Sequence, residues 1–211
     1  MTPMLQIALD IIPLDEAMTL VEQVRATVDI IEIGTPFIVK EGMRPVKAIK
    51  EAFGEKLVLA DVKIMDGGRA EAMYAFDAGA DIVTVMSVAQ DQTIKNVVKA
   101  ARERGRKVMA DMLACKDIAA RAAELDEFGV DYICVHTAFD VQHEVASPLE
   151  ELRTLVDTVK SAIPAVAGGI NLSNVERAAM LRPGVIVAGG AIINAEDRAE
   201  AARLMKAGMT I

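Results

Sequence analysis

The 211-residue sequence predicts an α/β protein with the (β/α)8 barrel fold, the TIM barrel, as a single domain over residues 1–211. Aliphatic segments recur at intervals of about fifty residues, the length of two successive strand–helix units. Segments with apolar residues at helical spacing lie between them. Near-continuous aliphatic strands are typical of a parallel sheet covered by helices, and eight such units close into a barrel. A doubly wound open sheet is the alternative.

Two series of aliphatic segments supply the eight expected strands. The first series predicts strands one, three, five and seven as QIALD (6–10), LVLAD (57–61), KVMAD (107–111) and AVAGG (165–169). The second predicts strands two, four, six and eight as VDIIEIG (28–34), ADIVTVM (80–86), VDYICVH (130–136) and PGVIVAGG (183–190). Helical spacing between strands is clear at Ile49, Ala52 and Phe53, and Gly or Pro punctuates the helix ends. We therefore expect short loops and no second domain.

Composition excludes several classes of protein. Charged residues are spread through the chain, and no uncharged apolar run approaches the roughly 18 residues of a membrane span. A net charge of −8 and few aromatic residues, two Tyr and five Phe without Trp, argue against a nucleic-acid surface. The beginning MTPMLQIALD lacks the pattern of a secretion signal, and Cys115 and Cys134 form no C-x-x-C motif. We expect a cytoplasmic protein with reduced thiols and a small-molecule partner.

Polar residues close most of the expected strands. They are Asp10, Glu32, Asp61 with Lys63, Asp111 and His136. In a (β/α)8 barrel the active site lies at the C-terminal ends of the strands, so we expect these side chains to meet in the barrel mouth. The two-residue spacing of Asp61 and Lys63 predicts that both point to one face of the strand and Val62 to the other. Asp10 and Asp111 are expected to bind substrate.

These residue types suit a metal-assisted reaction. Asp61 and Glu32 can hold Mg²⁺, with water and substrate oxygens completing its shell. Lys63 lies near Asp61, with Asp66 as a second candidate partner, so its ammonium form is favoured and it stabilises an anion rather than forming a Schiff base. A purely structural ion-pair cluster is the alternative interpretation of Asp61, Lys63 and Asp66.

The two histidines receive different interpretations. His136 follows a buried run and can act as a general acid or base, because imidazoles exchange protons near neutral pH. A buried histidine with only structural contacts is the alternative. His143 falls in the loop QHEVASP and is left out of the catalytic set.

Two glycine pairs end the last two expected strands, Gly168-Gly169 and Gly189-Gly190. Barrels often bind phosphate at this place through exposed amides and helix N-termini. Tight turns also need glycine, but the pairing on adjacent strands predicts a phosphorylated substrate.

The motif D-x-K-x-x-D at 61–66 resembles the hallmark of the orotidine-monophosphate-decarboxylase superfamily. Within it, the chain most resembles the 3-hexulose-6-phosphate synthase family through ALD (8–10), EIGTP (32–36), ADVKIMDGG (60–68), VHTAFDVQ (135–142), VAGGI (166–170) and VAGGAI (187–192). The resemblance implies an Mg²⁺-dependent aldolase that joins formaldehyde to D-ribulose 5-phosphate reversibly through a 1,2-enediolate. It also implies a homodimer in which Asp66 completes the partner's site.

Other activities fit parts of the pattern. The 3-keto-L-gulonate-6-phosphate decarboxylases resemble the chain throughout, but they carry arginines where this chain has Phe139 and Gly190. Orotidine-monophosphate decarboxylase itself uses no metal, and the chain shows no pyrimidine-binding loop. A sugar-phosphate epimerase or isomerase, and a sugar-phosphate binder without activity, remain as alternatives from other classes.

Overall fold

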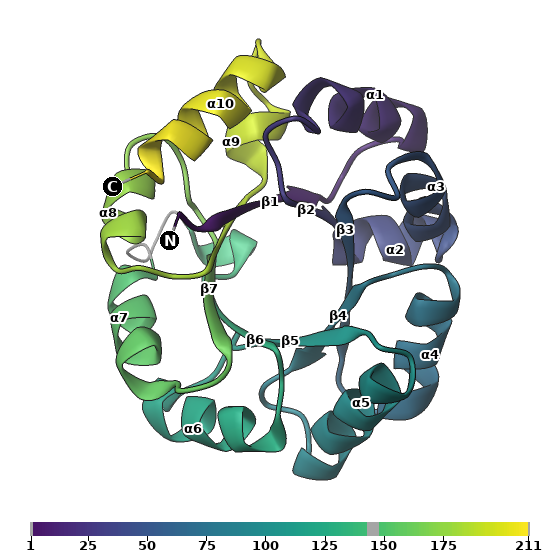
Figure 1. The fold of residues 1–211 in the computed structure, drawn as a ribbon, viewed down its shortest axis with the longest axis vertical. Helices are drawn as coiled ribbons and strands as arrows, with labels where there is room; N and C mark the ends of the chain where they lie inside the picture. Colours follow the sequence, from purple (N-terminus) through teal and green to yellow (C-terminus); the bar gives the residue numbers. More distant parts are fainter. Residues whose placement is uncertain (1, 143–147, 211) are drawn as a thin grey trace.

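The structure, a computed structural model, describes residues 2–142 and 148–210. Its eight strands form one closed parallel barrel in chain order, with β8 pairing back to β1 (Figure 1). The strands are β1 Met4–Leu9, β2 Ile30–Ile33, β3 Leu57–Ile64, β4 Ile82–Met86, β5 Lys107–Asp111, β6 Tyr132–His136, β7 Ile163–Ala167 and β8 Val185–Ala188. The predicted barrel is therefore confirmed, and each predicted segment overlaps its strand.

Helices surround the strands as an outer ring (Figure 1). They are α1 Leu14–Val24, α2 Thr35–Glu41, α3 Arg44–Ala52, α4 Gly68–Asp77, α5 Asp91–Glu103, α6 Ile118–Phe128, α7 Leu149–Thr158, α8 Val175–Met180, α9 Gly190–Ile193 and α10 Arg198–Gly208, with the 3-10 helix η1 at Phe139–Val141. The expectation of short loops throughout was wrong. Both α2 and α3 follow β2, the short helix η1 follows β6, and α9 precedes α10.

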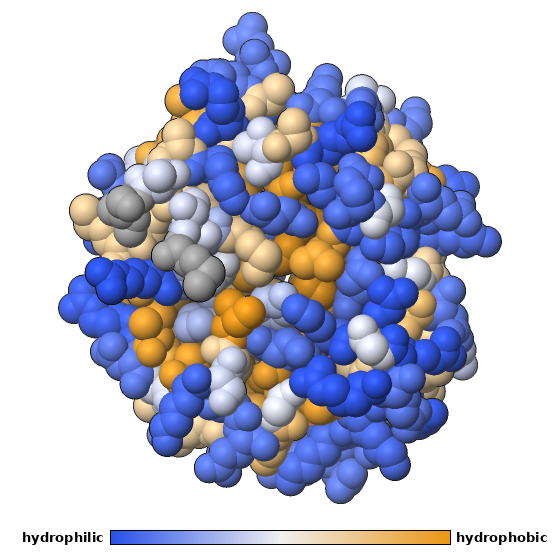
Figure 2. Space-filling view, viewed as in Figure 1, coloured by the Kyte–Doolittle hydropathy of each residue, from blue (hydrophilic) through white to orange (hydrophobic). Residues whose placement is uncertain are grey.

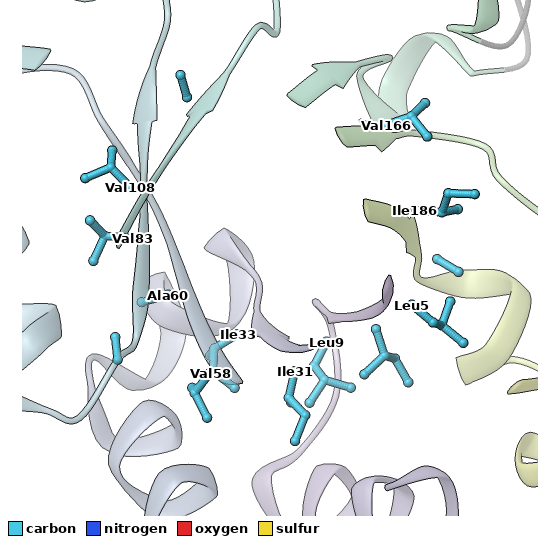
Figure 3. Close-up of a cluster of buried hydrophobic side chains, with 14 of the residues drawn as sticks. Leu5, Leu9, Ile31, Ile33, Val58, Ala60, Val83, Val108, Val166 and Ile186 are labelled. Atoms are coloured by element: carbon cyan, nitrogen blue, oxygen red, sulfur yellow. The ribbon is translucent and has the colours of Figure 1, made fainter. Parts of the chain in front are cut away.

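Most of the core lies between the strands and the helices. Alternate strand residues such as Leu5, Leu9 and Ile31 are fully buried and belong to the larger apolar cluster, and Figure 3 shows them on the helix-facing side of the strands. The helices bury matching stripes; α1 buries Ala17, Leu20, Val21 and Val24. Figure 2 shows that one face is mostly hydrophilic, with apolar side chains gathered near the barrel axis.

The other set of strand residues fills the barrel interior, and its character changes along the strands. A second apolar cluster includes Ile30, Leu59, Met109 and Tyr132. Two residues further along the same strands stand Glu32, Asp61, Asp111 and Cys134, all buried. The interior is thus apolar where the strands begin and polar where they end. We call the polar end the mouth and the opposite end the lower end.

Three aspartates tie neighbouring strands together at the lower end. We call Asp29, Asp81 and Asp131 the lower aspartates; each precedes an even-numbered strand. Their side chains accept the backbone N–H of Leu5, Val58 and Val108, at 2.7, 2.9 and 2.9 Å, and their own N–H groups donate to the carbonyls of the same three residues. The repeat near fifty residues seen in the sequence therefore corresponds to a repeated strand clamp.

The described residues bear on two properties expected from the composition, namely the absence of membrane-spanning helices and the state of the cysteines. None of their helices combines the length and apolarity that crossing a membrane requires. Cys115 and Cys134 are both free thiols. Burial, with the nearby Asp111 carboxylate, raises the pKa of Cys134 well above its usual value, so this thiol stays protonated.

Candidate active site

The Lys63 ammonium lies between two carboxylates at the centre of the mouth. Its Nζ is 2.8 Å from Asp61 Oδ2, 3.2 Å from Asp61 Oδ1 and 2.8 Å from Asp111 Oδ2. Burial works against the charged form, but Asp61 and Asp111 outweigh it and raise the pKa of Lys63. The side chain therefore stays an ammonium, as expected for an anion-stabilising lysine and not for a Schiff-base lysine. Its second partner is Asp111, whereas the sequence had suggested Asp66.

Asp111 joins Lys63 to His136. The Nδ1 atom of His136 lies 3.0 Å from Asp111 Oδ2 and 3.2 Å from Oδ1. Burial alone would favour the neutral acid, but His136 and Lys63 lower the pKa of Asp111 well below its usual value. An ionised carboxylate can only accept, so Nδ1 carries the proton in this pair, and Nε2 is the ring nitrogen left for proton transfer.

Glu32 is a third buried acid of the mouth, beside Asp61 and Asp111. Only 9% of its surface is exposed, and its Oε2 accepts a hydrogen bond of 2.7 Å from Gln6 Nε2. Burial and the Asp61 carboxylate raise the pKa of Glu32 well above its usual value. Among the described residues, the buried Oε1 of Gln6 has no hydrogen-bond partner. Around Glu32, two carboxylates thus repel each other, and the side-chain oxygen of Gln6 makes no hydrogen bond.

The donor set fits a hard cation that keeps part of its water shell. Glu32 and Asp61 offer carboxylate oxygens, the ligands that Mg²⁺ prefers. No group of three or more His, Cys, Asp or Glu side chains in residues 2–142 and 148–210 is arranged to hold a metal ion. A cation bound by these two carboxylates would take its remaining ligands from water and substrate.

Two threonines that the sequence analysis overlooked hold Asp61. Thr84 Oγ1 donates to Asp61 Oδ1 at 2.7 Å, and Thr35 Oγ1 lies 2.8 Å from Oδ2 and 2.7 Å from the Asp61 carbonyl. The sequence positions of both threonines could have indicated this role. Thr84 sits at an alternate, inward position of ADIVTVM, and Thr35 lies two residues beyond β2, at the start of α2.

The side chains of Asp61 and Lys63 meet in the mouth, and Val62 packs against the outer apolar cluster, as the two-residue spacing predicted, although the strand is irregular here. The register between β3 and β4 shifts between Ala60 and Ile64, and Lys63 has φ of 47°. This left-handed conformation is unfavourable for a residue with a Cβ, by roughly 1–2 kcal/mol. The spacing rule predicted the shared face correctly, but it did not predict the shifted register or the left-handed Lys63.

Asp10 lies at the rim, one residue beyond β1. It is exposed, yet the surrounding protein removes enough water, with help from the Asp61 charge, to raise its pKa. Gly34 makes this position possible, because a Cβ there would lie 2.0 Å from Asp10 Oδ1.

In the described part of the chain, Asp66 does not pair with Asp61 or Lys63, the two residues of its motif with which it was expected to act. It is exposed, and its Oδ1 accepts the N–H of Gly67 at 2.7 Å. Among the described hydrogen bonds and ion pairs of this chain, none joins Asp66 to Asp61 or Lys63. Its neighbour Met65 is 53% exposed, so this segment faces outward.

The glycine pairs lie at the mouth as predicted. Gly168 and Gly169 follow β7 with φ of 95° and 69°, and a Cβ on Gly168 would lie 2.3 Å from the Thr137 carbonyl oxygen. Gly189 and Gly190 follow β8 and begin α9. Close packing thus explains Gly168 without any ligand, whereas Gly169 and Gly190 are exposed at the rim. His143, which was left out of the catalytic set, lies outside the described residues.

Comparisons with known proteins agree with this geometry. The family model described as "Orotidine 5'-phosphate decarboxylase / HUMPS family" matches residues 3–205. The chain is 48% identical over 202 residues to a curated protein of Bacillus subtilis (strain 168) named 3-hexulose-6-phosphate synthase, covering 96% of each chain. These matches confirm the resemblance inferred from the D-x-K-x-x-D motif.

Solved structures of two enzymes share this fold, with different degrees of similarity to the chain. A crystal structure of 3-hexulose-6-phosphate synthase from Salmonella typhimurium superposes with a TM-score of 0.95 at 45% identity, covering 98% of each chain. The 3-keto-L-gulonate-6-phosphate decarboxylase of Vibrio cholerae superposes at 0.87 with 26% identity, covering 99% of this chain and 98% of its own. The chain therefore belongs to the orotidine 5'-phosphate decarboxylase / HUMPS family.

Proposed function

We propose that this protein is a 3-hexulose-6-phosphate synthase, a lyase that joins formaldehyde to D-ribulose 5-phosphate, reversibly, to give D-arabino-hex-3-ulose 6-phosphate. The observation that carries the proposal is the Lys63 ammonium held 2.8 Å from both Asp61 and Asp111, with His136 on the far side of Asp111. This arrangement suits a reaction that creates negative charge on a sugar oxygen. Relatives of that name at 48% and 43% identity support the same activity.

The chemistry requires a proton to leave C1 of ribulose 5-phosphate, which gives a 1,2-enediolate. The C1 carbon then forms a bond to the carbon of formaldehyde, and the former aldehyde oxygen takes up a proton. His136 can move these protons through Nε2, since Asp111 holds its Nδ1. Lys63 stabilises the enediolate oxygens as a fixed ammonium, and Asp10 and Asp111 bind sugar hydroxyls.

The substrate phosphate is expected at the two glycine turns after β7 and β8. Gly169 and Gly190 are exposed at the rim, and exposed backbone N–H groups are suitable partners for phosphate oxygens. Barrels commonly bind phosphate after these two strands. The sugar would then extend from this side of the mouth toward Lys63.

Glu32 and Asp61 would hold the divalent cation, which we propose is Mg²⁺. When bound, Mg²⁺ supplies positive charge next to the oxygens that become negative during the reaction. Burial and repulsion from Asp61 raise the pKa of Glu32, and the cation would relieve the repulsion.

A side-by-side assay tests the proposal against its nearest alternative. With Mg²⁺ present, we expect formaldehyde-dependent consumption of ribulose 5-phosphate and formation of the hexulose phosphate, measured by NMR. Excess chelator should abolish the reaction, and Lys63→Ala should lack it while Lys47→Ala, on an exposed lysine, keeps it. Release of CO2 from 3-keto-L-gulonate 6-phosphate without formaldehyde uptake would instead identify a decarboxylase. Inversion of a sugar centre without formaldehyde exchange would identify an epimerase.

The positions that separate the two enzymes favour the synthase. Phe139, in η1, is 79% exposed, and Gly190 carries no side chain at the rim. The decarboxylase group has arginines at the corresponding positions, which would add positive charge for a carboxylate substrate. This chain offers no such charge at either place.

We also propose that the protein acts as a homodimer in which Asp66 reaches the partner's site. The outward orientation of Asp66 and the exposed Met65 and Val39, at 53% and 80%, support this arrangement. Lys63→Ala and Asp66→Ala should each be inactive alone. When equal amounts are mixed and allowed to exchange subunits, half the dimers are mixed and each regains one intact site, so about a quarter of the wild-type activity should return. A monomer in sedimentation analysis, or no recovery despite exchange, would contradict this.

A further inference from the structure

The strand β3 is irregular at the point where it delivers Asp61 and Lys63. Ala60 pairs with Val83 and Ile64 pairs with Val85. The three residues between Ala60 and Ile64 therefore lie opposite Thr84 alone. A regular parallel ladder would place one residue opposite another, so β4 lacks the backbone groups needed to pair with the extra length of β3.

The Thr84 side chain replaces the backbone acceptor that β4 lacks. Its Oγ1 accepts the Lys63 N–H at 2.9 Å and lies 2.7 Å from Asp61 Oδ1. A hydroxyl has one hydrogen, and a backbone N–H can only donate, so the Thr84 hydrogen points to the Asp61 carboxylate. Thr84 is 3% exposed, so water cannot readily replace either contact.

This hydroxyl fixes the residue whose backbone is under strain. Lys63 has φ of 47°, and strained conformations persist only where surrounding contacts determine them. From that backbone the side chain turns into the mouth, where Nζ reaches Asp61 and Asp111. The same Thr84 hydrogen bond sets the rotation of the Asp61 carboxylate.

We propose that Thr84 is a positioning residue for the reaction. Its hydroxyl locks Lys63 in the left-handed conformation and so holds the ammonium between Asp61 and Asp111. This inference rests on the proposed function, because it concerns the same site. Thr84 itself need not touch the substrate.

Thr84→Val tests the inference, because it keeps the shape of the side chain and removes the hydroxyl. We expect kcat for the formaldehyde reaction to fall by about 100-fold, the loss typical of a misplaced catalytic group. KM for ribulose 5-phosphate should change little, because the glycine turns lie on other strands. Thr84→Ser keeps the hydroxyl and should restore most of kcat.

The matched control is Thr93→Val, at a threonine of α5 that is also buried, at 9% exposure. It should leave kcat unchanged. Wild-type kcat in Thr84→Val, equal losses in Thr84→Val and Thr84→Ser, or an equal loss in Thr93→Val would each overturn the inference. If Thr84→Val fails to fold, Thr84→Cys replaces it, since a thiol donates and accepts only weakly. Its kcat should then lie between those of wild type and a Lys63 variant, and full wild-type kcat would contradict the proposal.

A crystal structure of Thr84→Val, or of Thr84→Cys if that variant replaces it, separates this inference from the proposed function. Lys63 should leave the left-handed region, and Nζ should no longer contact both carboxylates. If Lys63 keeps φ near 47° and both contacts, the inference fails even if the protein is a synthase. If the wild type lacks synthase activity but Lys63 moves in the variant, the proposed function fails and the positioning role of Thr84 stands.

Discussion

Carboxylates occur at both ends of the barrel strands, and their partners differ between the two ends. The lower aspartates each accept a backbone N–H and pair with cations from the outer helices or, for Arg106, from the residue before β5. These are Lys206 for Asp29, Lys50 and Arg106 for Asp81, and Arg102 for Asp131. Their charges are therefore balanced within the fold.

Of the upper carboxylates, Glu32, Asp61 and Asp111, the last two pair with the Lys63 ammonium, and none of the described ion pairs involves Glu32. The shortage of positive charge appears in Glu32, whose pKa is raised well above the usual value by burial and Asp61. A fold that only needed stability would not keep three buried acids around one lysine. The difference indicates that the lower aspartates hold the barrel together, whereas the upper carboxylates are the residues for which we propose a cation and a substrate.

The largest effect is expected from removing the charge at the centre of the upper group. Lys63→Ala should lower kcat by about 1,000-fold, the cost of losing one preorganised charge stabiliser. Steady-state kinetics measure the loss, and circular dichroism shows whether the barrel is intact. The exposed Lys47→Ala should match wild type. A folded Lys63→Ala protein with kcat within tenfold of wild type would contradict a catalytic role for the upper group.

Replacing a lower aspartate should reduce stability and leave kcat unchanged, the opposite of the effect expected at Lys63. Asp81→Ala removes an acceptor that is 12% exposed and pairs with Lys50, and it leaves the Val58 N–H without its partner. We expect the free energy of unfolding to fall by about 2–3 kcal/mol, measured by urea denaturation, while kcat of the folded protein stays unchanged. Asp77→Ala, at an exposed ion pair with Arg104, is the control and should cost under about 1 kcal/mol. Loss of kcat without loss of stability in Asp81→Ala would reverse the assignment.

Asp29 should show a smaller version of the same effect. Its side chain is 38% exposed against 12% for Asp81, so water can replace part of what the substitution removes. Asp29→Ala should lower the free energy of unfolding by about 1 kcal/mol. A larger loss than in Asp81→Ala would show that burial does not set the strength of these clamps.

The smallest expected effect has the opposite sign. The pKa of Glu32 is raised in the folded state, so the folded protein keeps its proton while the unfolded chain loses it near a pH of about 4.3. The carboxyl therefore destabilises the fold as the pH rises from that value through its folded-state pKa. Glu32→Gln should raise the Tm of the metal-free protein at neutral pH, and the gain should disappear near pH 4.

The effect of Mg²⁺ on the Tm tests Glu32 as a metal ligand. A cation that binds the folded state stabilises it by mass action, so Mg²⁺ should raise the Tm of wild type but not that of Glu32→Gln. The exposed Glu22→Gln serves as control and should respond like wild type. An equal Mg²⁺ response in wild type and Glu32→Gln would remove Glu32 from the proposed metal site.

The barrel and the polar ends of its strands could be predicted from the amino-acid sequence alone. Alternating aliphatic runs such as KVMAD at 107–111, which coincide with β5 Lys107–Asp111, depend on local composition and periodicity. Because parallel strands of one barrel end at one face, the same pattern predicts that Glu32, Asp61, Lys63, Asp111 and His136 lie together.

The contacts among these residues depend on how the strands pair in three dimensions. Asp111, distant in sequence, pairs with Lys63, whereas the nearby Asp66 faces outward. The shifted register of β3 against β4, the left-handed Lys63 and the hydroxyl of Thr84 arise from pairing between two strands. Sequence periodicity describes one strand at a time and assumes a regular ladder, so it cannot contain an irregularity that a neighbouring strand imposes and stabilises.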